Sequence, residues 1–169
     1  VTTSKLHEEV RALKKLKHLE TPYVVKLFAH KLLADNCRVF HFEHPNSQAD
    51  GNNGDGVDNE RFEALRYERP KSDCGASILH GFAGYFESVL YGDVLLSIRP
   101  ETHTPNMFSW FPIYFPLVHP VYLEPGQREI RVNMWRRSAR HKVWYEYALA
   151  CPVMQPMVNP EGRSYAAEL

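Results

Sequence analysis

The chain has 169 residues, 44% of them hydrophobic, and 20 Lys+Arg balance 20 Asp+Glu. This length suggests one domain with a real core, and the neutral balance gives no electrostatic case for nucleic acid or an anionic membrane as a direct partner. No run of about 18 apolar residues could span a bilayer, and the N-terminus lacks the apolar core of a signal peptide. The odd number of cysteines, without CxxC spacing, fits free thiols in a reducing compartment: Cys37, Cys74 and Cys151.

The first part of the chain predicts a short helix over residues 4–19. Ser4 is a plausible N-cap, and Pro22 ends the pattern. We therefore divide the chain into a helical segment, residues 1–20, and a β domain, residues 21–169. The helix is predicted because hydrophobic residues recur at spacings of three and four and form one apolar stripe: Leu6, Val10, Leu13 and Leu16.

After the helix, the spacing of the hydrophobic residues changes to the pattern that is typical of strands. Residues 23–33 and 38–44 predict a hairpin around a turn at 34–37. Residues 45–60 are rich in Gly, Asn and Asp and predict a mobile surface loop. Residues 61–68 predict a short strand.

The second half of the chain predicts further hairpins. Residues 77–91 and 94–100 form a second pair around Tyr91-Gly92-Asp93. Alternation at 128–135 and 142–150 predicts a hairpin, after a Pro-Gly turn at 125–126. With about seven to nine short strands and turn signals about every eight to twelve residues, the chain predicts a mainly β fold, an antiparallel β-barrel or sandwich with one short N-terminal helix.

Residues 102–117, THTPNMFSWFPIYFPL, raise a separate question. The stretch is aromatic and uncharged from Thr104 to Leu117, and its three prolines exclude a helix and argue against a central strand. It could be a loop that packs into the core. It could also be the wall of a ligand pocket, because flat aromatic faces attract a guanidinium or trimethylammonium group. Residue types alone leave both readings open.

The sequence carries no convincing motif for a nucleotide cofactor, a metal ion or catalysis. The glycines of residues 51–56 do not open a helix, so they do not predict a phosphate loop. Read as a calcium loop from Asp50, the segment has Arg61 where an acid is needed. His41 and His44 point to opposite faces of a strand, so we predict no metal site. With no nucleophile motif or acid pair, we expect no catalytic residue in this chain.

Four long stretches closely resemble, in the right order, the C-terminal region of the symmetric-dimethylating (type II) protein arginine methyltransferases. Two shorter stretches match the start of that region, so the resemblance covers nearly the whole chain. The long stretches are residues 79–91, 96–117, 142–153 and 159–169, and the shorter ones are residues 4–12 and 21–27.

The resemblance implies an architecture and a reaction. Such enzymes join an N-terminal TIM barrel and a cofactor-binding Rossmann domain to a C-terminal β-barrel, and this chain is similar to the barrel alone. They transfer a methyl group from S-adenosyl-L-methionine to a substrate arginine, giving symmetric dimethylation. The family's cofactor-binding glycines and two catalytic glutamates match nothing here. We therefore expect this fragment neither to bind the cofactor nor to be active.

The resemblance also implies a site. In the family, one loop of the barrel reaches into the active site. Most members have Thr-His-Trp in this loop, whereas type II enzymes have Phe-Ser-Trp, as at Phe108, Ser109 and Trp110 here. With Phe111, these are the implied substrate-binding residues. A dimerisation arm is expected at or beside residues 4–19.

Further expectations concern the parent enzyme. The resemblance implies substrates such as histone or RNA-processing protein tails, a homo-oligomeric parent, a WD-repeat adaptor bound outside this domain, and a role in chromatin regulation in the cytoplasm and nucleus. The alternative is a free-standing β-barrel or sandwich binding module without activity, with the aromatic loop as its site. A metal-dependent cupin-like enzyme is a further alternative.

Overall fold

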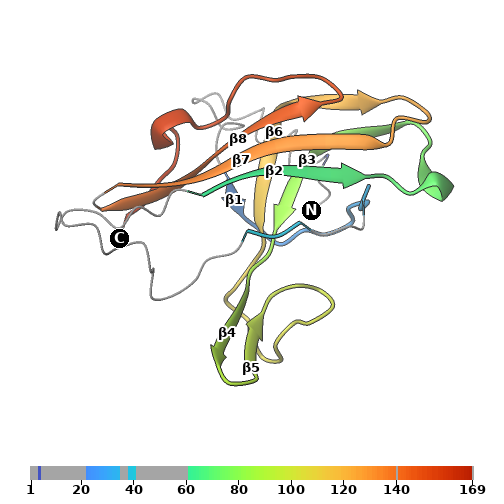
Figure 1. Cartoon of the computed structure of the whole chain (residues 1–169). Coiled ribbons are helices and arrows are strands. Elements are labelled where there is room, and N and C mark those ends of the chain that lie inside the picture. The colour runs from blue at the N-terminus through green and yellow to red at the C-terminus, as the bar shows by residue number, and fades with distance from the viewer. Residues whose placement is uncertain (1–3, 5–21, 35–37, 41–60, 140, 169) are drawn as a thin grey trace. The chain divides into compact units, whose positions relative to one another are not determined.

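The computed structural model describes residues 4, 22–34, 38–40, 61–139 and 141–168 (Figure 1). The predicted helix at 4–19, the boundary at residue 20, the loop at 45–60 and both His41 and His44 fall outside these residues, apart from Ser4. They stay predictions.

The described elements are strands and two short 3-10 helices, Lys71–Asp73 (η3) and Pro160–Gly162 (η4). They divide into two compact units, residues 1–31 with 80–120 and residues 32–79 with 121–169. The strands are β1 (Tyr23–Val24), β2 (Arg61–Glu68), β3 (Ser77–Gly84), β4 (Glu87–Tyr91), β5 (Val94–Ser97), β6 (Ile113–Leu123), β7 (Glu129–Ala139), β8 (Lys142–Cys151) and β9 (Ala167–Glu168).

The described strands form three sheets, ordered β1-β6-β3, β2-β7-β8-β9 and β4-β5. The pairs β1–β6, β2–β7, β4–β5, β7–β8 and β8–β9 are all antiparallel. The mainly β, antiparallel prediction is therefore confirmed, as is the hairpin β7–β8. The predicted strand over residues 77–91 is instead two strands: β4 pairs with β5 as expected, but β3 lies in the sheet with β6. The predicted closed barrel is not seen: among the described strands no sheet pairs back onto its own first strand. Strands β1 and β9, at the edges of their sheets, have only two residues each, which is too few to continue the strand pairing around a barrel.

Other strand predictions also differ from the structure. Tyr23 and Val24 pair with Tyr114 and Ile113 of β6, and the described residues 25–34 and 38–40 form no strand of the predicted hairpin. The prolines also do not keep the aromatic stretch out of a central strand, because β6 contains Pro116 and lies between β1 and β3.

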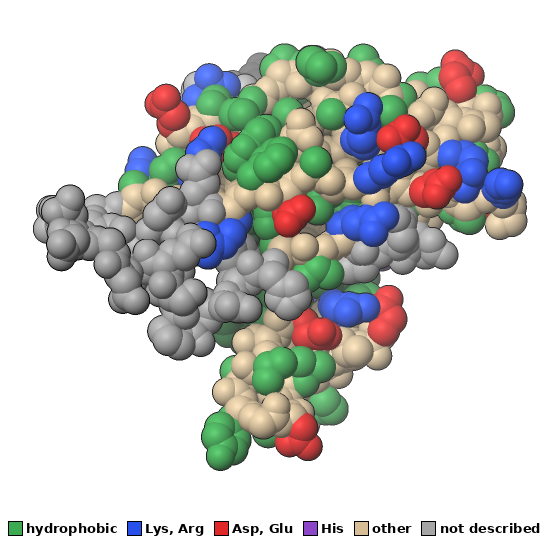
Figure 2. Space-filling view, viewed as in Figure 1, with side chains coloured by type: hydrophobic (Ala, Val, Ile, Leu, Met, Phe, Trp, Pro, Cys, Tyr) green, Lys and Arg blue, Asp and Glu red, His purple; other side chains and the backbone are tan. Residues whose placement is uncertain are grey.

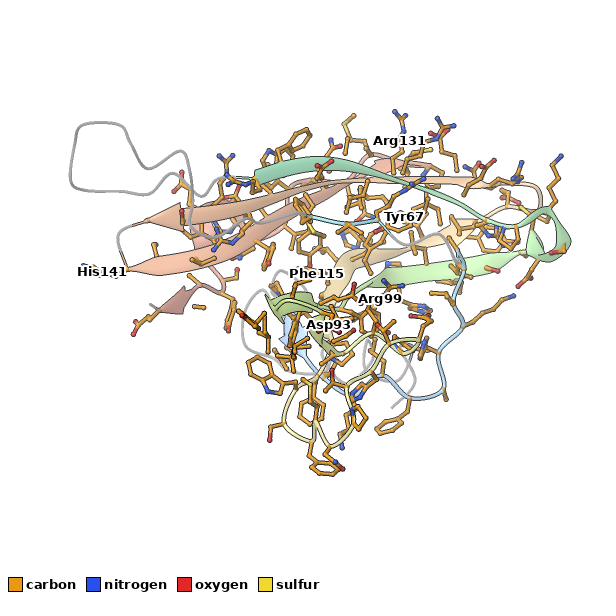
Figure 3. All side chains as sticks on the ribbon, turned by 60° about the horizontal axis from the view of Figure 1, so that its bottom comes forward. Tyr67, Asp93, Arg99, Phe115, Arg131 and His141 are labelled. Atoms are coloured by element: carbon orange, nitrogen blue, oxygen red, sulfur yellow. The ribbon has the colours of Figure 1, made fainter. Side chains whose placement is uncertain are left out.

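In the first unit, Gly81 of β3 closely approaches β6 (Figure 3 labels Phe115). A Cβ on Gly81 would collide with the Phe115 carbonyl oxygen and lie 2.8 Å from the Tyr114 ring. The Tyr114 hydroxyl donates a hydrogen bond to the His80 carbonyl at 2.9 Å. Burial raises the pKa of Tyr114, so the hydroxyl stays protonated and remains a donor. Because β6 begins at Ile113, this contact fixes one end of the aromatic loop.

In the second unit, the predicted alternation of β7 and β8 forms the core. Val132 and Tyr147 are fully buried. On the other face, the buried Glu146 carboxylate accepts hydrogen bonds from Trp144 Nε1 at 2.9 Å and from the Glu161 backbone N–H at 2.6 Å. Arg137 donates to it as well, at 3.3 Å. A buried charge thus holds the segment around η4 against β8.

We predict that Gly81→Ala destabilises the chain by about 1–3 kcal/mol, because the new methyl group has no space next to the β6 backbone. The matched control is Gly75→Ala, where an added Cβ meets nothing within 4 Å and the expected change is within about 0.5 kcal/mol. Urea unfolding of both variants measures this. Equal stabilities would show that the close approach is not a constraint.

An exposed aromatic loop and its pocket

The aromatic loop, residues 102–112, joins β5 to β6 and has no regular structure, as its prolines predict. Its first end is tied to β5: the Thr104 N–H donates to the Ser97 carbonyl and the Ser97 N–H donates to Thr104 Oγ1, both at 2.9 Å. The Ser97 and Thr102 hydroxyls are 2.8 Å apart, and Ser97 is fully buried. At the other end the Val25 N–H donates to the Pro112 carbonyl at 3.1 Å. The loop is therefore anchored at both ends.

The middle of the aromatic loop faces outward. Phe108 is 79% exposed and Trp110 is 57% exposed, whereas Trp135 and Trp144 are half-buried. The Trp110 ring meets Phe86 edge-on, with centroids 5.2 Å apart. Two large aromatic side chains thus lie in solvent on an anchored loop.

The loop borders a solvent-open pocket of about 500 Å³ within the first unit. Three of the four predicted site residues line it, namely Phe108, Trp110 and Phe111, and Ser109 does not. The segment after β1 forms another part of the wall, including Phe28. The structure therefore places the predicted residues in one loop and three of them around one cavity.

The described residues that line the pocket include basic side chains but no carboxylate. Among the described residues that line it, the ionisable side chains are Lys26, His30, His103 and Tyr85, and none is a carboxylate. Lys26 Nζ lies 5.0 Å from the centre of the Phe111 ring, a cation–π arrangement. Burial, followed by the negative charge of Glu101, raises the pKa of Tyr85. The aromatic wall can accept a cation, but these residues supply no negative charge to it.

Sequence reasoning missed the pocket residues outside the loop. Lys26, His30 and Tyr85 lie about 20 or more positions from Phe108 and follow no ligand spacing. Tyr85 and Phe86 fall inside the stretch 79–91, and Lys26 inside the stretch 21–27, that carry the family resemblance, which is the one signal that could have marked them.

The described residues contain no group of three or more His, Cys, Asp or Glu side chains that could hold a metal ion. No helix that the structure describes is both long and apolar enough to cross a membrane.

We predict that Trp110→Ala costs about 1 kcal/mol of unfolding free energy, because the loss is mainly the contact with Phe86. A buried Trp would cost roughly 3–5 kcal/mol. Trp110 should also be the tryptophan most quenched by acrylamide, which Trp→Phe variants at positions 110, 135 and 144 would measure. If Trp110 is the most protected, or if its loss unfolds the chain, the loop is part of the core.

Comparison with known proteins places these features in a family. A family model described as the PRMT5 oligomerisation domain matches residues 1–167. A protein of Oryza sativa subsp. japonica named protein arginine N-methyltransferase 5 is 47% identical over 165 residues, which are 98% of this chain and 24% of that protein. The Xenopus laevis protein of the same name is 44% identical over 174 residues, covering 100% of this chain and 26% of that protein.

A more distant relative gives the same result. Protein arginine N-methyltransferase skb1 of Schizosaccharomyces pombe is 37% identical over 155 residues, covering 87% of this chain and 24% of that protein. The chain thus spans about a quarter of the length of these relatives. The resemblance found in the sequence is confirmed, and the chain belongs to the PRMT5 oligomerisation domain family.

Proposed function

We propose that this chain acts within a longer arginine methyltransferase, where it supplies an aromatic wall to the pocket for the substrate arginine. The longer protein would transfer a methyl group from S-adenosyl-L-methionine to an arginine nitrogen and give symmetric dimethylarginine. The relatives' names support methyl transfer to arginine. Those names also favour this function over a free-standing binding module.

One observation carries the proposal: Trp110 is more than half exposed on a loop that is anchored at both ends. An indole face held in water loses hydrophobic stabilisation unless something covers it. A guanidinium stacked on it would gain about 0.5–2 kcal/mol, and more once water is excluded. The Lys26 ammonium group over Phe111 supports this reading, because the same wall already accepts one cation.

The negative charge for such a guanidinium must come from elsewhere. The ionisable residues described in the pocket wall carry no carboxylate, and Lys26 would repel an incoming cation. The two glutamates that the resemblance implies would supply the opposite charge from outside this chain. Their task would be positioning and electrostatic stabilisation, and the part of this chain would be to close the pocket.

The cofactor does not fit the described residues. A nucleoside cofactor is typically held where a glycine-rich loop opens a helix after a strand. In the part of the chain that the structure describes, strands follow strands, and the two helical elements are three-residue 3-10 turns. We therefore assign S-adenosyl-L-methionine to a part of the longer protein outside this chain.

The remaining assignments concern the parent protein. The family description supports oligomer formation. We propose histone or RNA-processing protein tails as substrates, a WD-repeat adaptor bound outside this domain, and action in the cytoplasm and nucleus in chromatin regulation. The support for these assignments is the family resemblance alone.

The function is tested by Trp110→Ala in the full-length parent protein. We expect kcat/KM for an arginine-containing peptide to fall at least about tenfold, equal to about 1.4 kcal/mol, because the stacking face is lost. The matched variant Trp110→Phe keeps an aromatic face and should retain most of the activity. Wild-type kcat/KM in Trp110→Ala would exclude the loop from the arginine pocket.

The assignment of the cofactor has its own test. Isothermal titration of the purified 169-residue chain with S-adenosyl-L-methionine should give no binding heat, while the full-length parent serves as the positive control. Saturable binding of the cofactor by the chain alone would contradict the assignment.

A further inference from the structure

Three side chains with hydrogen-bond donors line the pocket, and no described residue uses these donors. Lys26, His30 and His103 all border the pocket, and all three are exposed. The Lys26 ammonium group lies over the Phe111 ring and makes no ion pair with a described residue. The two imidazole rings likewise make no hydrogen bond or ion pair with the described residues. Because an ammonium group has three N–H donors and a neutral imidazole has one, the pocket offers several donors to an incoming group.

Several described arginines, by contrast, lie against carboxylates. In the same unit, Arg99 is 3.8 Å from Glu87 and 3.6 Å from Glu101 (Figure 3 labels Arg99). On the sheet of the second unit, Arg128 pairs with Glu68 at 2.8 Å. Figure 2 shows the same pattern over β2 and β7, where blue Lys and Arg side chains lie among red Asp and Glu side chains. The ammonium group in the pocket differs from these compensated surface charges.

The carboxylate of Glu101 acts on the pocket but does not line it. Its negative charge adds to burial in raising the pKa of Tyr85, which does line the pocket. The Tyr85 hydroxyl therefore stays protonated and can donate a hydrogen bond. Glu101 itself is engaged with Arg99. A negative charge for Lys26 must therefore come from outside the described pocket wall.

Both walls of the pocket contain a non-glycine residue in the left-handed region. Ala29 has φ 45° and Asn106 has φ 63°. Ala29 lies between two pocket residues, Phe28 and His30, and Asn106 directly precedes Met107, which also lines the pocket. The left-handed conformation costs an ordinary residue about 1–2 kcal/mol, and residues held in it cluster at ligand sites. The local strain in both walls thus supports a binding role for the pocket.

We propose, on the basis of the proposed arginine pocket, that Lys26 with His30 and His103 binds an anionic side chain of the substrate close to the methylated arginine. A pocket of about 500 Å³ is roughly 10 Å across, and an extended peptide advances about 3.3 Å per residue, so the anion would lie within about three residues of the arginine on Trp110. A carboxylate or a phosphorylated side chain has the required charge and acceptor oxygens. Such an anion would also remove the repulsion between Lys26 and the incoming guanidinium group. The substrate would thus bring its own compensating charge.

The test compares arginine-containing peptides as substrates of the full-length parent protein. The peptides of a pair differ only in Asp or Asn at one position, two residues before the arginine in one pair and two residues after it in the other. In at least one pair the wild-type enzyme should show about three- to tenfold higher kcat/KM for the Asp peptide, through a lower KM, because a carboxylate gains charge-assisted hydrogen bonds. Phosphoserine at the same position separates the two sources of the anion, since the larger preference identifies the source.

Substitutions of one lysine connect this preference to the pocket. Lys26→Met should bring the ratio of kcat/KM for the Asp and Asn peptides to about one, because the ammonium group is lost while an aliphatic chain remains over Phe111. Lys26→Arg should keep the preference, since the positive charge is restored. Lys31→Met is the matched control and should also keep it, because Lys31 is an exposed lysine of the same segment that does not line the pocket.

A preference for the anionic peptide that only Lys26→Met abolishes supports the proposal. Anionic peptides that are no better substrates than the Asn peptides overturn it, as does a preference that Lys26→Met leaves unchanged or that Lys31→Met also abolishes. The arginine wall fails separately, through wild-type activity in Trp110→Ala. If Trp110→Ala impairs the enzyme and the charge next to the arginine has no effect, the anion site alone is excluded.

Discussion

The first unit depends on the close approach of β3 to β6 at Gly81. No side chain fits there, because its Cβ would meet the Phe115 carbonyl and the Tyr114 ring. The contact allows the Tyr114 hydroxyl to reach the His80 carbonyl and fixes the start of β6. Together with the Ser97–Thr104 bonds at the other end, it holds an irregular aromatic loop in one place. The exposed position of Trp110 is a consequence of this anchoring.

Two apolar elements of the first unit, the aromatic loop and the β4–β5 hairpin, are left exposed. They share a base: Phe86 lies directly before β4, contacts Trp110, and accepts a hydrogen bond from the Ile98 N–H at 3.1 Å. Exposed apolar surface on well-anchored backbone costs stability in an isolated chain. The proposed substrate arginine would cover the aromatic loop, and the β4–β5 hairpin stays exposed in the part of the chain that the structure describes.

The sequence predicted the features that local patterning determines. Strand 61–68, the turn at Gly126 with its positive φ, and the alternation of Ile130, Val132 and Met134 agree with the structure. The sequence-based prediction failed where strand pairing is non-local, because no pattern in residues 23–24 indicates β6 as their partner. The proline rule also failed, because Pro116 lies inside β6. For the site, the loop residues were found through family resemblance, whereas Lys26 and Tyr85 reach the pocket only through tertiary folding.

The central claim is that Trp110 contacts the substrate arginine in the full-length protein. The most direct measurement replaces Trp110 by a photoreactive phenylalanine analogue and irradiates the protein with an arginine-containing peptide, with position 122 as the control. The account predicts a peptide adduct at position 110 that is lost when the peptide's arginine is replaced by alanine, and no adduct at position 122. Cross-links from position 110 only to the protein's own core, with no peptide adduct, would contradict it.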